Sequence, residues 1–179
     1  MFAPVRPTLL IDVDGVLSLF GFDFADPPFG CPVSVDGTPH WLSSTAGPHL
    51  VRLAATFDCV WCTGWEERAE DHLPRLLGLP GGWPHLRFDQ GPSPHGHWKL
   101  AAIDAYAGPD APLAWIDDAH DDACARWAAA RPGETLLIQT NPAVGLTAGH
   151  VEELEVWARG VRPLRDAGNG AAQGSGSDP

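Results

Sequence analysis

The sequence predicts an α/β fold, a doubly wound parallel sheet with helices on both faces. Four short runs rich in apolar, β-branched and aromatic residues recur along the chain, at residues 8–13, 57–63, 113–118 and 135–140. Each run is nearly continuous rather than alternating, which is typical of strands that are covered on both faces. Helical patterns separate the runs, and this alternation of strand and helix indicates a Rossmann-like sheet.

The helical patterns follow the strands in a regular order. A last helix is expected after Thr147, which suits an N-cap, because Val151, Leu154 and Trp157 then share one face. Earlier helices are predicted at residues 49–57, 66–79, 97–108 and 121–133, and a weak extra strand at 86–88.

The segment over residues 18–48 does not follow this rhythm. Within it, residues 33–35 and 38–41 are two short extended stretches that flank Asp36 and Gly37. Asp-Gly is a favoured two-residue hairpin turn. The sequence therefore predicts a small β-hairpin flap inserted after the first strand.

Composition and charge limit the possible functions. The chain has 179 residues, of which 44% are hydrophobic and 19% charged, and we expect a single domain over residues 1–165 with a polar, Gly-rich, disordered tail over 166–179. A formal charge of -12 disfavours tight binding to nucleic acid, which could enter only as a substrate end. The apolar run near the N-terminus is too short for a membrane span, so we expect a soluble, cytoplasmic protein with no membrane partner.

The cysteines and histidines do not form a recognisable metal or redox motif. Cys59 and Cys62 lie in one predicted strand, where residues three apart point to opposite faces, so both are interpreted as buried structural thiols. No second CxxC pair completes a zinc site. His95 and His97 lack a third ligand and are interpreted as polar loop residues.

Acidic and hydroxyl side chains cluster at the ends of the predicted strands. Asp12 and Asp14 close the first strand, Thr63 the second, and Asp117 and Asp118 the third. Ligands of open α/β sheets bind beyond the carboxyl ends of the strands, so we expect these residues to converge. Carboxylates packed this closely disfavour each other's ionisation unless a cation lies between them. An all-oxygen ligand set selects Mg²⁺ as that cation.

Lys99 is the only lysine in the chain. Because arginine is used everywhere else, this position indicates a need for a compact ammonium rather than a planar guanidinium. Asp118, Asp121 and Asp122 remain alternatives as further metal ligands, because acidic residues are also favoured in the first turn of a helix.

The ordered set LLIDVDGVL, WCTGW, HWKL and WIDD resembles the four motifs of the haloacid dehalogenase (HAD) superfamily. The resemblance covers roughly residues 8–160. Further details, including TGWEERA and the short flap, are similar to HAD domains of bacterial RNA-repair proteins.

This resemblance implies a role for each motif residue. Asp12 is the expected nucleophile that accepts the phosphoryl group, and Asp14 is the expected general acid and base. Thr63 is expected to bind the phosphoryl oxygens, and Lys99 to neutralise Asp12 and the transferring group. Asp117 would hold Mg²⁺ together with Asp12 and the backbone carbonyl of Asp14.

The expected activity is Mg²⁺-dependent hydrolysis of a phosphate monoester through an aspartyl phosphate on Asp12. Thr63, Gly64, Trp65 and Lys99 are the expected substrate-binding residues, with Trp65 either stacking on a substrate ring or covering the helix behind it. Because the flap is small, the open crevice suits a large substrate, a nucleotide or a nucleic-acid end. Alternatives are a catalytically idle domain that binds a phosphorylated ligand and a phosphotransferase.

Overall fold

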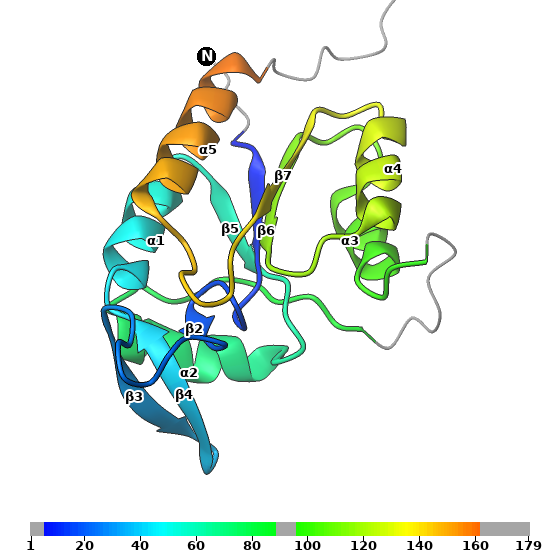
Figure 1. Cartoon of the computed structure of the whole chain (residues 1–179). Coiled ribbons are helices and arrows are strands. Elements are labelled where there is room, and N and C mark those ends of the chain that lie inside the picture. The colour runs from blue at the N-terminus through cyan, green and yellow to red at the C-terminus, as the bar shows by residue number, and fades with distance from the viewer. Residues whose placement is uncertain (1–5, 89–95, 162–179) are drawn as a thin grey trace, which may run out of the picture.

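The computed structural model describes residues 6–88 and 96–161, and its centre is a four-stranded parallel sheet (Figure 1). The strand order is β5-β1-β6-β7. The strands are β1 (Thr8–Ile11), β5 (Asp58–Trp61), β6 (Leu113–Asp117) and β7 (Thr135–Gln139). The α/β class and the parallel sheet are thus confirmed, although β1 ends two residues earlier than predicted.

Helices cover both faces of this sheet, as predicted (Figure 1). The helices are α1 (Ala46–Ala54), α2 (Glu67–Leu77), α3 (Leu100–Ala107), α4 (Asp122–Ala130) and α5 (Ala148–Gly160). Alternate strand residues face opposite ways, so Leu9 and Ile11 pack in the cluster that contains α1, α2 and α5, whereas Leu10 packs with α3 and α4.

Two helices differ from their predicted bounds at the N-terminus. α1 begins at Ala46 rather than at residue 49, because Pro48 is tolerated in a first helical turn. α3 begins at Leu100 rather than at residue 97, with Lys99 as its N-cap. α5 begins as predicted, since the Thr147 hydroxyl accepts a hydrogen bond from the His150 amide at 3.3 Å.

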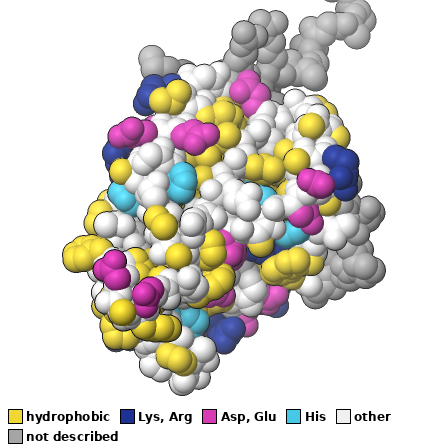
Figure 2. Space-filling view, in the orientation of Figure 1, with side chains coloured by type: hydrophobic (Ala, Val, Ile, Leu, Met, Phe, Trp, Pro, Cys, Tyr) yellow, Lys and Arg dark blue, Asp and Glu magenta, His cyan; other side chains and the backbone are white. Residues whose placement is uncertain are grey.

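The flap is a three-stranded antiparallel sheet in the order β2-β4-β3. The predicted hairpin is formed by β3 (Gly30–Val35) and β4 (Thr38–Ser43), and both turn residues, Asp36 and Gly37, have positive φ. The sequence did not reveal β2 (Ser18–Leu19), which pairs with β4. Hydrophobic side chains gather over the part of the surface where the flap lies (Figure 2), and Phe24 and Phe29 are exposed.

The strand predicted at residues 86–88 is wrong. On the side of β5 that does not pair with β1, strand pairing is confined to a single bridge between Trp61 and His85. The Phe88 amide donates to the Glu66 carboxylate at 3.0 Å and therefore does not continue a ladder.

The cysteine prediction is confirmed, because Cys59 and Cys62 are buried, unpaired and packed on opposite faces of the sheet. Burial raises the pKa of the Cys59 thiol to about 12, which leaves it unreactive at neutral pH. The tail predicted for 166–179 and His95 lie outside the described residues. Within the described ranges, no helix is long and apolar enough to cross a membrane.

Candidate functional site

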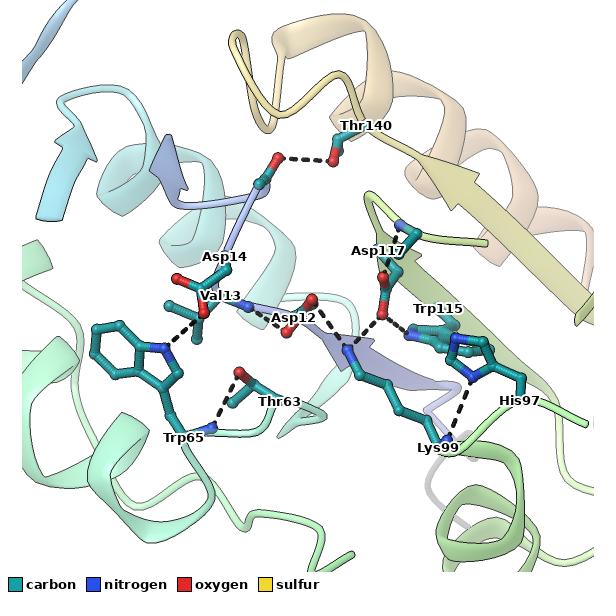
Figure 3. A network of polar contacts seen from close by, with 12 residues as sticks. Asp12, Val13, Asp14, Thr63, Trp65, His97, Lys99, Trp115, Asp117 and Thr140 are labelled. Carbon is teal, nitrogen blue, oxygen red and sulfur yellow. Dashed lines mark hydrogen bonds and ion pairs between the residues drawn. The ribbon is translucent and has the colours of Figure 1, made fainter. Parts of the chain in front are cut away.

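The register of the sheet brings three of the sequence motifs to one level. Ile11 pairs with Trp61 on one side and with Ile116 on the other. Asp12, the residue that follows β1, is therefore level with the ends of β5 and β6, and its side chain meets that of Asp117 there (Figure 3).

Lys99 joins these two carboxylates from the N-cap position of α3. Its Nζ lies 3.0 Å from Asp12 Oδ2 and 2.6 Å from Asp117 Oδ2, and its side chain is only 3% exposed (Figure 3). Isolated charges are costly to bury, so each of these groups depends on the others for its charge. The predicted role of a compact ammonium at this position agrees with the geometry.

Further hydrogen bonds fix both carboxylates, in addition to their contacts with Lys99. The other oxygen of Asp12 accepts from the amide of Val13 at 2.8 Å. Asp117 accepts from the Trp115 indole at 3.1 Å and from the Ala119 amide at 2.9 Å. These donors keep the acidic groups in place before any ligand binds.

Burial and charge shift the pKa values of this group. Burial, opposed by Lys99 and reinforced by Asp117, raises the pKa of Asp12 from 3.8 to about 6. Burial alone would lower the pKa of Lys99, but the neighbouring carboxylates raise it above its ordinary value, so Lys99 stays protonated. Burial and the Asp117 charge raise the pKa of Asp118.

Asp118 completes a group of carboxylates that fits a small divalent cation. One oxygen from each of Asp12, Asp117 and Asp118 lies within 4.8 Å of the others. Two oxygens bound on opposite sides of Mg²⁺ at about 2.1 Å are about 4.2 Å apart, so a small closure suffices. The excess of negative charge over the single ammonium also favours a cation.

Of the three acids that the sequence leaves open as metal ligands, Asp118 is the one that lies in the carboxylate group found among the described residues. Asp121 is the N-cap of α4, where its carboxylate accepts from the Cys124 amide at 2.9 Å, and Asp122 lies in the first helical turn. Neither belongs to the carboxylate group found among the described residues. The Asp14 side chain is also outside that group, and its predicted contribution is its backbone carbonyl.

Gly15 and Thr140 fix the loop that follows Asp14. Gly15 has a φ of +72°, and a β-carbon there would lie 2.4 Å from the Asp118 carboxyl carbon. Only glycine therefore permits both the turn and the approach of Asp118. Thr140, from the end of β7, donates to the Gly15 carbonyl at 2.9 Å (Figure 3).

Asp14 lies on the open side of the site, with its side chain 52% exposed. The Trp65 indole donates to Asp14 Oδ2 at 2.9 Å (Figure 3). His40, which reaches over from the flap, places Nδ1 3.9 Å from Asp14 Oδ1 and packs against the Trp65 ring at a centroid distance of 4.6 Å. The Ser18 hydroxyl contacts the same His40 nitrogen at 3.0 Å.

The other predicted substrate-binding residues lie at the end of β5. Thr63 is buried, and its hydroxyl accepts from the Trp65 amide at 3.4 Å. Trp65 is also buried, which leaves little of its ring for a substrate and favours the covering role over stacking. Gly64 adjoins the ring of Trp98, a half-exposed tryptophan that sequence reasoning missed.

His40 and His97 also depart from the sequence analysis. His40 was not singled out, since nothing local links it to Asp14. His97 is buried rather than a polar loop residue, and packs edge-on against Trp115 at 5.5 Å. The Lys99 amide donates to its Nδ1 at 3.3 Å, so His97 supports the turn that delivers Lys99 (Figure 3).

Comparisons with protein-family models and with curated proteins find no match to this chain. Its function is therefore inferred from the geometry of the site and from the motif resemblance.

Proposed function

We propose that the protein is a Mg²⁺-dependent phosphatase that hydrolyses a phosphate monoester through an aspartyl phosphate on Asp12. The observation that carries this proposal is the contact of Lys99 Nζ with both Asp12 and Asp117, with Asp118 beside them. A lone salt bridge would need one carboxylate. Three carboxylates around one ammonium leave an excess of negative charge that a divalent cation would neutralise, so that a phosphoryl group could approach.

The first chemical step is transfer of the phosphoryl group to Asp12. Its carboxylate oxygen attacks phosphorus while the bond to the ester oxygen breaks, and Asp14 gives its proton to that departing oxygen. Lys99, already beside Asp12, offsets the charge of the incoming phosphoryl oxygens. Thr63 supplies a hydroxyl for the same oxygens.

The second step regenerates the carboxylate. Asp14, now ionised, accepts a proton from water, whose oxygen attacks phosphorus and displaces Asp12. Inorganic phosphate leaves, and Asp14 is again protonated. Mg²⁺ held by Asp12, Asp117 and Asp118 would neutralise the phosphate and so lower the barrier to attack by an anion.

The position and exposure of Asp14 support hydrolysis over related chemistries. By family resemblance, phosphatases and mutases carry an acid two residues after the nucleophile, whereas dehalogenases and transport ATPases generally do not. Asp14 is open to solvent, so water can reach it, and the flap is small. Both observations favour water as the final acceptor of the phosphoryl group.

The direct test is hydrolysis of p-nitrophenyl phosphate with Mg²⁺. We expect turnover that EDTA abolishes and added Mg²⁺ restores, and a loss of at least about 10³-fold in kcat for Asp12→Asn. Asp71→Asn, which removes an exposed carboxylate of α2, is the matched control and should behave as the wild type. Full activity in a folded Asp12→Asn protein would falsify the mechanism.

A second readout distinguishes hydrolysis from phosphate binding without chemistry. Acid quenching during turnover of a ³²P-labelled substrate should trap label on the wild-type protein and none on Asp12→Asn. A protein that binds phosphate esters, gains thermal stability from them and never becomes labelled would be a binding domain.

A further inference from the structure

Trp98 is the only exposed tryptophan in the described part of the chain, with 51% of its surface accessible. Tryptophan is usually buried for most of its area, because its ring gains more from leaving water than other side chains do. Its position is also specific, since it directly precedes Lys99 and α3. An exposed indole beside a reactive centre calls for a functional explanation.

The Trp98 ring is stacked with the ring of His97 at a centroid distance of 6.2 Å, and three other neighbours hold it at the edge of the site. The Lys99 ammonium lies 5.1 Å from its centroid, a cation–π distance. The Phe88 ring packs edge-on against it at 4.7 Å. The third neighbour is Gly64, because a β-carbon there would lie 3.8 Å from the end of the indole.

These contacts place the indole beside both groups that are proposed to bind phosphate. Its ring lies near the Lys99 ammonium, and the end of the ring lies near the loop that carries Thr63 and Gly64. Gly64 carries no side chain that would come between the ring and Thr63. A leaving group attached to a phosphate at Lys99 therefore meets an apolar, planar surface as it emerges from the site.

We propose that Trp98 is a specificity-determining residue that stacks on a planar ring in the leaving group, so that the preferred substrates are nucleoside monophosphates. This inference rests on the proposed phosphatase function. Aromatic surfaces stack on any nucleobase, whatever its hydrogen-bonding pattern. The formal charge of -12 opposes a long polyanion, which favours a mononucleotide over a polynucleotide.

The test compares two pairs of substrates that differ only in the ring. A nucleoside 5′-monophosphate is paired with ribose 5-phosphate, and benzyl phosphate with cyclohexylmethyl phosphate. The measured quantity is the ratio of kcat/KM within each pair, with Mg²⁺ present. If a substitution of Trp98 also affects Lys99, kcat/KM changes by the same factor for both substrates of a pair, and this effect cancels in the ratio.

In Trp98→Ala we expect the nucleotide preference to fall by roughly 5- to 150-fold, the measured range for loss of one base stacked on an aromatic side chain. Trp98→Phe should retain much of the preference, whereas Trp98→Leu, which is apolar but not planar, should lose it. Tyr106→Ala is the control, because Tyr106 is another exposed aromatic residue, beside Asp58 at the opposite end of β5. It should leave both ratios unchanged.

Each other outcome overturns the inference. Parallel loss for both members of each pair would make Trp98 a support for Lys99 alone. A change confined to the benzyl pair would indicate an aryl or tyrosyl phosphate as the substrate. A preference for 5′-phosphorylated oligonucleotides over the mononucleotide that Trp98→Ala abolishes would indicate a polynucleotide end.

Binding keeps the inference testable if the proposed chemistry fails. Isothermal titration of the Asp12→Asn protein with the nucleotide and with ribose 5-phosphate, both with Mg²⁺, measures the same preference without turnover. If the wild-type protein hydrolysed none of the phosphate esters, the phosphatase proposal alone would be rejected. Equal affinities for the two ligands would reject the role of Trp98 alone.

Discussion

The carboxylates of the candidate site are fixed in two different ways. On the buried floor, which consists of Asp12, Lys99 and Asp117, one ammonium partly neutralises two carboxylates, and every member is almost fully removed from water. On the rim, which consists of Asp14, Trp65 and His40, one half-exposed carboxylate lies beside an indole and an imidazole ring. The floor is built by the sheet, whereas the rim needs the flap.

This difference agrees with the separate tasks proposed for the two regions. A nucleophile benefits from a fixed position and a constant local field, which the floor provides. A group that must release and accept a proton needs contact with the solvent and a fixed direction, which the rim provides. Changes to the floor should therefore alter stability, metal binding and activity together, whereas changes to the rim should alter one chemical step.

The largest effect is expected for Lys99→Met, which leaves the buried carboxylates of the floor without a counter-charge. Removing one partner from a buried ion pair typically costs 3–5 kcal/mol of unfolding free energy, and we expect about that loss at pH 7.5 by urea denaturation. Activity should fall by about 10²-fold or more. Arg75→Met, which removes an exposed cation of α2, is the control and should change stability by less than about 0.5 kcal/mol.

A double variant tests whether charge is the cause of this loss. In Lys99→Met/Asp117→Asn one of the stranded carboxylates is neutral, so part of the stability should return while activity does not. No recovery in the double variant would mean that Lys99 acts through packing of its alkyl chain, and the electrostatic account of the floor would be wrong.

The floor could largely be predicted from the sequence, because its signals are local. Apolar runs that end in acids mark the carboxyl edge of a parallel sheet, and a single lysine among arginines is conspicuous without any structure. The parallel sheet then brings Asp12 and Asp117 to one level. Only the choice of Asp118 over Asp121 required coordinates, since both follow the same strand.

The rim could not be predicted, because it depends on contacts between distant segments. His40 lies 26 positions after Asp14, and no periodic pattern connects them; only the pairing of β2 with β4 brings them together. A two-residue strand such as β2 leaves no signature in a sequence. For the same reason the sequence alone does not distinguish a stacking role of Trp65 from a covering role, because its ring packs against His40 of the flap.

The proposed metal site, which consists of Asp12 and Asp117 of the floor together with Asp118, is tested by Asp118→Asn. Losing one of three clustered carboxylates should weaken Mg²⁺ binding on the order of 10- to 100-fold by isothermal titration. Asp121→Asn is a close match in chemistry and position, and asparagine also caps helices well, so its Mg²⁺ affinity should stay within about twofold of the wild type. Equal losses in both variants would mean that the cation is bound by overall charge rather than by this group.

Proton competition at Asp12 should make Mg²⁺ binding depend on pH. The pKa of Asp12 is raised from 3.8 to about 6, first by burial, so the folded metal-free protein retains a proton that the unfolded chain releases between these values. This group therefore makes the metal-free protein more stable as the pH falls from about 6 towards 4. Mg²⁺ affinity should change in the opposite direction, falling by about tenfold per pH unit below 6.

Titrations at pH 5, 6 and 7.5 measure this dependence, with Asp12→Asn as the reference. Asp12→Asn should bind Mg²⁺ more weakly than the wild type. Its Mg²⁺ affinity should also change much less between pH 5 and 6. A wild-type Mg²⁺ affinity that is constant over this range would mean that no proton on Asp12 competes with the cation, and that Asp12 is not one of its ligands.

The smallest effect is expected on the rim, for Trp65→Phe and His40→Ala. Loss of the indole hydrogen bond to Asp14 costs about 0.5–1.5 kcal/mol, which corresponds to roughly 2- to 13-fold in rate. The loss should appear in kcat/KM for alkyl phosphates, whose oxygen needs the proton of Asp14 to depart. It should be nearly absent for p-nitrophenyl phosphate, because nitrophenolate leaves without a proton. A merely structural defect would lower kcat/KM equally for alkyl phosphates and for p-nitrophenyl phosphate. In that case the flap would support the fold without directing Asp14.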